Sequence, residues 1–235
     1  MKYAGGTDPG PVRPNNEDAY HAAPRLLAVA DGVGGHAAGE VASATIIEAL
    51  APLGDSEPGY DLVGRLLGAV VEGNAAIARR VAEDARLQGM STTLTAVLFG
   101  DGRFCLLNIG DSRTYLLRDD VLEQLTRDDS YVQLLVDQGH ITQEAAGSHP
   151  QRNLVLQALT GEEVMEPAMT VHEARAGDRF LLCSDGLSDV VPHAVLGDVL
   201  RAGAPQECVD RLIELAIDAG TRDNVTAIVA DLVAG

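Results

Sequence analysis

The chain has 235 residues, of which 46% are hydrophobic, so we expect residues 1–235 to fold as a single domain around a sizeable apolar core. The 35 acidic residues outnumber the 17 basic ones and give a net charge of −18, which argues against nucleic acid or an anionic membrane surface as a partner. Lys2 is the only lysine, which excludes a Gly-Lys-Ser/Thr phosphate-binding loop and any chemistry that needs an internal lysine.

The cysteines and the apolar runs indicate a cytoplasmic protein. Cys105, Cys183 and Cys208 are odd in number, lie far apart and form no Cys-x-x-Cys pair, so we expect reduced core residues. The first residues have no apolar signal core, and no segment approaches about 18 consecutive apolar residues. We therefore expect neither a secretion signal nor a membrane span in this sequence.

The first third of the chain starts with a polar loop and continues with a strand and two helices. Arg13 to Asp18 is rich in turn-forming residues, and 26–30 is an apolar run typical of a buried strand. Helical spacing predicts helices over 38–51 and 61–86, joined by the loose stretch 52–59. In the second helix we expect a buried face formed by Val63, Leu67, Val70, Ile77 and Val81.

The rest of the chain is mostly strands. Short runs of β-branched and aliphatic residues predict strands at 92–99, 104–109, 114–117, 169–172, 180–183 and 225–230. Tight Gly/Asp turns between residues 92 and 126 indicate an antiparallel meander. A last helix over about 205–219 should bury Val209, Leu212, Ile213, Ala216 and Ile217. Because helices and strands cluster separately along the sequence, the fold class is α+β with antiparallel sheet.

Four predicted strands carry an aspartate at one tip. Asp31, Asp111 and Asp185 follow the strands at 26–30, 104–109 and 180–183, and Asp223 precedes the strand at 225–230. If these tips share one end of the sheets, the carboxylates converge, and like charges so close require a compensating cation. Oxygen ligands without His or Cys suit Mg²⁺ or Mn²⁺ rather than zinc, and Gly32 lets a backbone carbonyl approach the same ion.

Each of these motifs also has a plainer interpretation. Asp-Gly is common turn chemistry, so one tip alone carries little weight, whereas four together favour a metal site. Arg13 is a planar donor suited to phosphate, and the neighbouring Glu17 and Asp18 could hold metal-bound waters. An Asn-rich acidic loop before a strand is equally an ordinary turn.

Together, the motifs resemble those of the metal-dependent serine/threonine phosphatases, the protein phosphatase 2C (PPM) family, and its bacterial members in particular. The matching pieces appear in the family's order from residue 3 to about residue 231, which is nearly the whole chain. They are Arg13…Asn16-Glu17-Asp18, Asp31-Gly32-Val33-Gly34-Gly35-His36…Gly39-Glu40, Gly89-Met90-Ser91-Thr92-Thr93, Gly110-Asp111-Ser112-Arg113, Ser184-Asp185-Gly186 and Asp223-Asn224-Val225-Thr226.

The resemblance implies a four-layer αββα sandwich, in which two antiparallel sheets are flanked by helices. It also implies a centre of two Mn²⁺ or Mg²⁺ ions at one edge of the sandwich. In that centre Asp31 would bridge both ions, Asp185 and Asp223 would ligate one ion, and the Gly32 carbonyl would ligate the other.

The resemblance further implies roles for the remaining site residues. Glu17 and Asp18 would hold metal-bound waters, Arg13 would bind the substrate phosphate, and Asp111 with Asp185 would form a third, weaker metal site. The implied activity is hydrolysis of phosphoserine and phosphothreonine in proteins by a metal-bridging water, without a phosphoenzyme. Consistently, the sequence has no Cys-x5-Arg and no Asp-x-Asp signature of the competing phosphatase chemistries.

The sequence departs from the family pattern at several positions. Val33 replaces a histidine that many eukaryotic members use to protonate the leaving group, and valine cannot do this. His36 and a metal-bound water are alternatives, although His36 is also interpretable as a loop residue. Asp129 stands where bacterial relatives commonly have histidine, which leaves it without an assigned role.

Residues 130–160 match the mobile flap that follows the meander in bacterial members. His149 and Arg152, both in this flap, are candidates for contact with substrate. The plainer interpretation is a helix–loop–helix segment with solvated polar residues.

Three functions remain to be weighed. The first is a Mn/Mg-dependent protein serine/threonine phosphatase, and the second is a regulatory pseudophosphatase or phosphoprotein-binding module with the same fold. The third, another metal-dependent hydrolase such as a nuclease, is disfavoured by the acidity. Expected partners are phosphorylated proteins, including a serine/threonine kinase, and the chain is expected to be a monomer. It would act in the cytoplasm, or as the cytoplasmic domain of a longer membrane-anchored protein.

Overall fold

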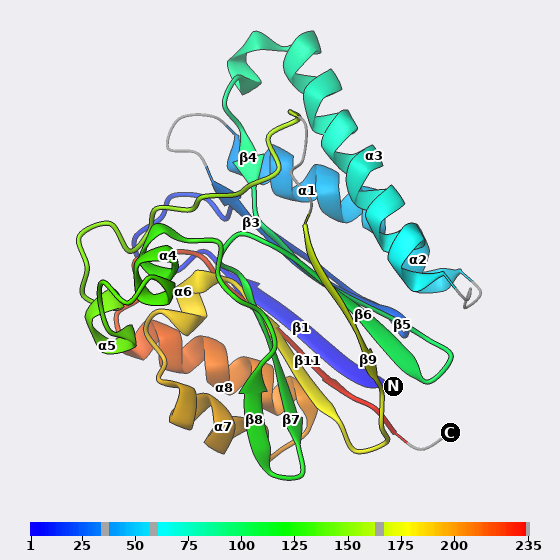
Figure 1. The fold of residues 1–235 in the computed structure, drawn as a ribbon, viewed down its shortest axis with the longest axis vertical. Helices are drawn as coiled ribbons and strands as arrows, with labels where there is room; N and C mark the ends of the chain where they lie inside the picture. The colour runs from blue at the N-terminus through cyan, green and yellow to red at the C-terminus, as the bar shows by residue number, and fades with distance from the viewer. Residues whose placement is uncertain (34–37, 57–60, 163–166, 234–235) are drawn as a thin grey trace.

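Two antiparallel sheets lie face to face in the computed structural model, which describes residues 1–33, 38–56, 61–162 and 167–233 (Figure 1). The five-stranded sheet consists, in order, of β1 (Lys2–Asp8), β11 (Val225–Asp231), β10 (Arg179–Cys183), β7 (Arg113–Arg118) and β8 (Val121–Gln124). The six-stranded sheet consists of β2 (Asp18–Ala22), β3 (Leu26–Val33), β5 (Leu94–Gly100), β6 (Arg103–Ile109) and β9 (Ala168–Glu173), with β4 (Ser91–Thr92) paired to β3.

Helices cover the outer faces of both sheets, which gives the four layers of the predicted αββα sandwich (Figure 1). The six-stranded sheet is covered by α1 (Gly39–Leu50), α2 (Pro52–Asp55) and α3 (Leu62–Glu83), followed by a 3-10 turn (Ala85–Leu87). The five-stranded sheet is covered by α6 (Asp185–Ser188), α7 (His193–Leu200) and α8 (Pro205–Asp218). The fold class α+β is therefore confirmed.

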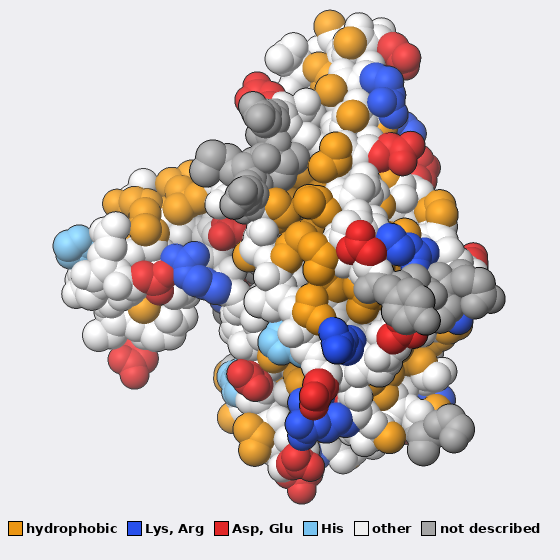
Figure 2. Space-filling model, turned by 45° about the vertical axis from the view of Figure 1, so that its right-hand side comes forward, with side chains coloured by type: hydrophobic (Ala, Val, Ile, Leu, Met, Phe, Trp, Pro, Cys, Tyr) orange, Lys and Arg blue, Asp and Glu red, His pale blue; other side chains and the backbone are white. Residues whose placement is uncertain are grey.

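The flap lies between β8 and β9, at one end of the sandwich. It contains α4 (Tyr131–Asp137) and α5 (Gln143–Ala146), each of which begins with a hydroxyl cap, Ser130 and Thr142 respectively. In Figure 2 it forms a lobe that projects from the body of the molecule. The helix–loop–helix interpretation of this segment therefore agrees with the structure.

The interior between the two sheets changes character along the strands. At one end the three phenylalanines pack edge to face, with ring centroids of Phe99 and Phe104 at 5.2 and 5.0 Å from that of Phe180. At the other end, buried hydroxyl groups meet in pairs. Thr95 Oγ1 lies 2.8 Å from Thr114 Oγ1, and Thr93 Oγ1 lies 2.8 Å from Ser112 Oγ. This hydroxyl layer consists of Thr93, Thr95, Ser112 and Thr114. It lies next to the strand tips that carry the predicted metal ligands.

The strands at 26–30, 104–109, 114–117, 169–172, 180–183 and 225–230 are confirmed, but the structure adds strands that the pattern did not reveal. β1 contains two glycines and few apolar residues. Gly5 is explained by the ring of Tyr20 on β2, because a Cβ at Gly5 would lie 2.4 Å from a ring carbon. The predicted strand 92–99 is interrupted at Thr93, which separates β4 from β5.

The predicted helices are confirmed, but the prediction of which residues of α3 are buried is partly wrong. Leu62 and Leu66 face the core, whereas Val63 is 40% exposed. At the start of this helix the buried face is therefore rotated by about one residue relative to the prediction. Asp61 caps the helix here, because its side chain accepts a hydrogen bond from the Gly64 N–H. In α8, Val209, Leu212 and Ala216 are buried, and the predicted Ile217 lies at the exposed edge.

The three cysteines are buried, as predicted, and none forms a disulfide. Burial raises the pKa of the Cys105 thiol to about 11 and that of Cys183 to about 12, which makes both poor nucleophiles. Among the described residues, no helix combines the length and apolar character needed to cross a membrane.

Candidate functional site

The predicted acidic residues meet at the end of the sandwich that holds the hydroxyl layer. A cavity of about 260 Å³ opens there, where β3, β6 and β10 end and β11 begins. Its walls come from segments far apart in the sequence: Arg13, Glu17, Asp31, Gly32, Val33, Asp111, Asn153, Val155, Asp185 and Asp223. The four aspartates at strand tips therefore share one cavity.

Asp31 is positioned by the backbone of β3. Its carbonyl accepts hydrogen bonds from Thr93 N at 2.9 Å and Thr92 Oγ1 at 2.9 Å. Desolvation, followed by the nearby carboxylates of Asp18 and Asp185, raises the pKa of Asp31 well above its ordinary value. Without a nearby cation, the ionised form of Asp31 is disfavoured in these surroundings. A bound cation would favour it, so Asp31 is suited to bind one.

Gly32 leaves its backbone open to the cavity because no side chain fits there. A Cβ at Gly32 would lie 2.5 Å from the carbonyl of Gly39 and 2.6 Å from the carbonyl oxygen of Glu17. The Gly32 N–H donates to that Glu17 oxygen at 3.1 Å. Close packing of three backbone segments thus fixes the predicted carbonyl ligand.

Asp185 follows a strand of the five-stranded sheet, and Asp111 lies where the chain crosses from the six-stranded to the five-stranded sheet. Asp185 is the first residue of α6, directly after β10, and Asp111 lies in the turn between β6 and β7 with only 8% exposure. Desolvation and then the Asp111 charge raise the pKa of Asp185 well above its ordinary value. Desolvation and then Asp128 raise the pKa of Asp111 to about 7. The Asp111 carboxylate is therefore close enough to Asp185 to disfavour its ionised form.

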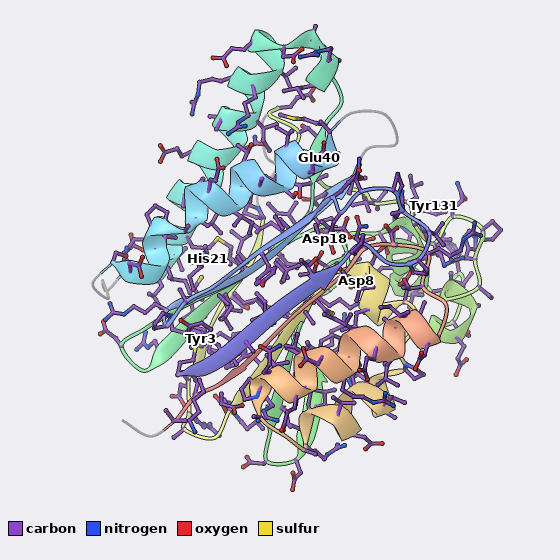
Figure 3. All side chains as sticks on the ribbon, turned by 180° about the vertical axis from the view of Figure 1, so that it is seen from behind. Tyr3, Asp8, Asp18, His21, Glu40 and Tyr131 are labelled. Carbon is purple, nitrogen blue, oxygen red and sulfur yellow. The ribbon has the colours of Figure 1, made fainter. Side chains whose placement is uncertain are left out.

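Asp18 stands at the start of β2, at the same end of the molecule as Asp8 and the first turn of α1 at Glu40 (Figure 3). Its Oδ2 accepts hydrogen bonds from Ser184 Oγ at 2.8 Å and Thr226 Oγ1 at 2.6 Å. Its Oδ1 is buried and has no hydrogen-bond partner among the described residues. Desolvation raises the pKa of Asp18 to about 6. An orphaned carboxylate oxygen is an acceptor for a water of a metal shell.

Arg13 and Glu17 reach the cavity from the loop between β1 and β2. Arg13 Nη2 donates to Asp223 Oδ2 at 2.5 Å, and the arginine side chain is 46% exposed. Asn224 holds this loop in place, because its Oδ1 accepts from Glu17 N at 2.8 Å and its Nδ2 donates to the carbonyl of Asn15 at 2.9 Å. Asn224 belongs to the motif Asp223-Asn224-Val225-Thr226, and the sequence alone does not show which loop it holds.

The composition of the cavity fits hard divalent ions. Its acidic groups are all carboxylates, supplemented by a backbone carbonyl, and Arg13 is the cation among the described residues that line it. In the described part of the chain, no three His, Cys, Asp or Glu side chains are drawn together into a closed cluster. The carboxylates instead line an open cavity, as suits ions that retain several waters.

The flap contributes residues that sequence reasoning missed. Asn153 and Val155 line the cavity, although nothing in their spacing pointed to this. The predicted Arg152 lines an adjoining pocket of about 200 Å³, which shares Asp111 with the cavity. The predicted His149 packs its ring 6.2 Å from that of Tyr131 and is not part of either lining. Val33 lines the cavity, and His36 is outside the described residues.

Comparison with known proteins gives consistent matches over the whole chain. The family model for "Protein phosphatase 2C" matches residues 13–212. The serine/threonine protein phosphatase PstP of Mycobacterium tuberculosis is 58% identical over 233 residues, which cover 99% of this chain and 45% of PstP. The serine/threonine phosphatase stp of Listeria monocytogenes is 34% identical, with 96% of this chain and 93% of that protein covered. The chain thus spans about half the length of its mycobacterial relative.

Solved structures agree with the fold. The crystal structure of the M. tuberculosis phosphatase PstP/Ppp is 57% identical and superposes with a TM-score of 0.96, with 99% of each chain covered. The PstP catalytic domain in complex with two manganese ions is 55% identical, with a TM-score of 0.94 and coverage of 99% of this chain and 98% of that one.

Proposed function

Because the chain belongs to the protein phosphatase 2C family, we propose that it is a Mn²⁺- or Mg²⁺-dependent protein serine/threonine phosphatase. The observation that carries this proposal is the cavity in which Asp31, Asp111, Asp185 and Asp223 meet beside Arg13. The manganese-bound PstP domain, at 55% identity, supports the choice of metal. Residues 1–235 would act as one catalytic domain.

The proposed ligands are carried over from the family motifs, and all of them line the cavity. Asp31, Asp185, Asp223 and the Gly32 carbonyl would hold two divalent ions there. When bound, two divalent ions supply an activated water and offset the negative charge of the phosphoryl oxygens. The orphaned Oδ1 of Asp18 would accept a hydrogen bond from a water of this shell.

The substrate phosphate would bind between this shell and Arg13. The Arg13 guanidinium is half-exposed and lies at the cavity wall, so it can turn its second edge to a phosphoryl oxygen. Glu17, whose pKa is raised by desolvation and then by Glu40, would orient a further water. Val33, at the cavity wall, has no titratable group. The leaving-group alkoxide would therefore take its proton from solvent or from another side chain.

Asp111 with Asp185 would form a third, weaker metal site. Both carboxylates line the cavity, and Asp111 also lines the adjoining pocket beneath the flap. The substrates would be phosphorylated proteins, including a serine/threonine kinase, and the chain would act as a monomer in the cytoplasm or as a cytoplasmic domain of a longer membrane-anchored protein. The relatives named serine/threonine phosphatases support this substrate class.

The proposal is tested with p-nitrophenyl phosphate and a phosphothreonine peptide. After removal of metal with a chelator, we expect no turnover of either substrate, and turnover should return with Mn²⁺ or Mg²⁺. Asp31→Asn should abolish it, while Asp137→Asn, a matched change on the exposed part of the flap, should not. A protein that binds the phosphopeptide but shows no turnover with either ion would instead be a pseudophosphatase.

A further inference from the structure

Thr93 connects the segments that carry two predicted metal ligands. It is fully buried, and its Oγ1 accepts a hydrogen bond from the backbone N–H of Asp31 at 3.1 Å. The same oxygen lies 2.8 Å from Oγ of Ser112, the residue that follows Asp111. One hydroxyl therefore contacts both the six-stranded sheet at Asp31 and the turn that holds Asp111.

The contact between Thr93 and Asp31 replaces one rung of a β-ladder. β3 pairs with β5 through Val29↔Thr95, and with β4 through Gly32↔Thr92, so the shared register places Thr93 opposite Asp31. In a regular antiparallel pair, opposite residues at a hydrogen-bonded position exchange two backbone N–H···O=C bonds. Here Thr93 N donates to the Asp31 carbonyl as usual, but the Asp31 N–H donates to the Thr93 hydroxyl rather than to its carbonyl.

The Thr93 carbonyl is occupied in another way. It accepts a hydrogen bond from Thr92 Oγ1 at 3.0 Å, and the same hydroxyl also lies 2.9 Å from the Asp31 carbonyl. The interruption between β4 and β5 thus places side-chain oxygens around the backbone of Asp31. This explains physically why the single strand expected over 92–99 is divided at Thr93.

We propose that Thr93 is a positioning residue, whose hydroxyl sets the place of Asp31 relative to the Asp111 turn and so fixes the geometry of the metal centre. The inference rests on the proposed metal-dependent function. Without the hydroxyl, the Asp31 N–H would lose its acceptor or turn to the Thr93 carbonyl, and either change displaces the ligand. Groups that orient metal ligands from behind typically change metal affinity by about 10- to 100-fold when they are removed.

Thr93→Val isolates this role, because valine is similar in shape and is favourable in strands. The methyl and Cβ of Thr93 already fill the space at Gly110, where a Cβ would lie 2.6 and 2.7 Å from them, and valine keeps these contacts. Thr93→Ser keeps the hydroxyl and should rescue the site.

Thr95, two residues further along the chain and within β5, provides a matched control. It is equally buried, and its Oγ1 makes the same kind of contact to Thr114 Oγ1 at 2.8 Å between the sheets. Among the described residues, the Thr95 side chain makes no hydrogen bond to any of the predicted ligands. Thr95→Val therefore removes an equivalent hydroxyl from the layer without altering the support of Asp31.

The test measures Mn²⁺ binding directly, by calorimetric titration of chelator-treated protein, with circular dichroism of the apoprotein as the check on folding. We expect Thr93→Val to weaken Mn²⁺ binding by about tenfold or more, and Thr93→Ser and Thr95→Val to stay within about twofold of the unmodified chain. Equal Mn²⁺ affinity in Thr93→Val, or an equal loss in Thr95→Val, would overturn the proposal.

A second variant keeps the test decisive if Thr93→Val does not fold. Ser112→Ala removes the partner that orients the Thr93 hydroxyl and leaves the contact with Asp31, so we expect an intermediate loss of Mn²⁺ affinity. Unchanged affinity in a folded Ser112→Ala protein would then count against the role of Thr93. Absence of Mn²⁺ binding in the unmodified chain would contradict the proposed function itself, which separates the two failures.

Discussion

Arg13 and Asp223 are 210 residues apart in sequence, yet Nη2 of the arginine lies 2.5 Å from Oδ2 of the aspartate. The pair joins the loop between β1 and β2 to the start of β11 at the wall of the cavity. The proposed phosphate-binding cation is thus held directly beside a proposed metal ligand. Substrate and metal would therefore share one electrostatic environment.

Arg13→Ala should weaken substrate binding and preserve the metal centre. We expect the KM for p-nitrophenyl phosphate to rise by about 10- to 100-fold, the loss expected for hydrogen bonds to a charged group. Mn²⁺ affinity should be kept, because the four carboxylates and Gly32 remain. Steady-state kinetics at saturating Mn²⁺ and a Mn²⁺ titration measure the two effects, and Arg13→Lys should be intermediate because it keeps the charge without the planar fork. Loss of Mn²⁺ binding with an unchanged KM would show that Arg13 supports the ligands rather than the substrate.

Asp111→Asn should stabilise the metal-free protein in a pH-dependent way. The pKa of Asp111 is raised to about 7, so its contribution to stability is present below its unfolded-state pKa and is lost as the pH rises through the folded-state value. Above the folded-state pKa, ionised Asp111 therefore destabilises the folded protein, and the uncharged asparagine removes this cost of burying a charge. Relative to the unmodified apoprotein, the variant should gain little near pH 4 and on the order of 2–4 kcal/mol near pH 8. Thermal unfolding in chelator at both pH values measures the gain, and an equal gain at both would contradict the account.

Asp129→Ala should affect large substrates more than small ones. Asp129 N donates to the Gly110 carbonyl at 2.8 Å, Gly110 N donates to Asp129 Oδ2 at 3.1 Å, and the Asp129 carbonyl accepts from Leu156 N at 2.7 Å. This residue therefore ties both ends of the flap to the turn that carries Asp111, and Val155 beside Leu156 lines the cavity.

For Asp129→Ala we expect kcat/KM on a phosphothreonine peptide to fall by about tenfold, as for one lost hydrogen bond, and p-nitrophenyl phosphate to stay within about twofold. Asp129→Asn retains an acceptor for Gly110 N and should behave like the unmodified chain. Equal losses on both substrates would assign Asp129 to the stability of the catalytic centre instead.

Asp178→Ala should reduce stability without changing the catalytic site. Asp178 is 1% exposed, and its carboxylate accepts from Arg118 Nε at 2.7 Å and Nη2 at 2.6 Å, at the end of β7 near its turn to β8. Removing the carboxylate takes away the charged partner of the partly exposed Arg118 guanidinium, so the free energy of unfolding should fall by about 2–3 kcal/mol. Asp198→Ala, which breaks an exposed pair with Arg201, should cost at most about 1 kcal/mol. Urea unfolding compares the two variants, and similar losses in both would contradict this assignment.

Much of the fold was predictable because burial leaves a periodic pattern. The apolar strands 180–183 and 225–230 and the helix at 38–51 were found in this way. β1 was not, because its two glycines give no apolar signal and its pairing with β11 depends on residues more than 200 positions away. The face of α3 was misjudged near Val63 because two overlapping apolar stripes fit one helical period, and only the sheet decides between them.

The acidic residues of the site were predictable from their places at strand tips and from the family motifs. Their supports were not. Asn224, Thr93 and Asp129 act through contacts with backbone groups of distant segments, and such contacts depend on how the two sheets are stacked. Asn153 and Val155 reach the cavity only because the flap folds back toward it.

Metal bound at this cavity would perform the hydrolysis, and determining bound Mn²⁺ and phosphatase activity on the same sample tests this most directly. Starting from chelator-treated protein, turnover of the phosphothreonine peptide should rise from zero in step with bound Mn²⁺, as the proposed two-ion centre between Asp31, Asp185 and Asp223 fills. Turnover that persists in chelator without bound metal would contradict the account.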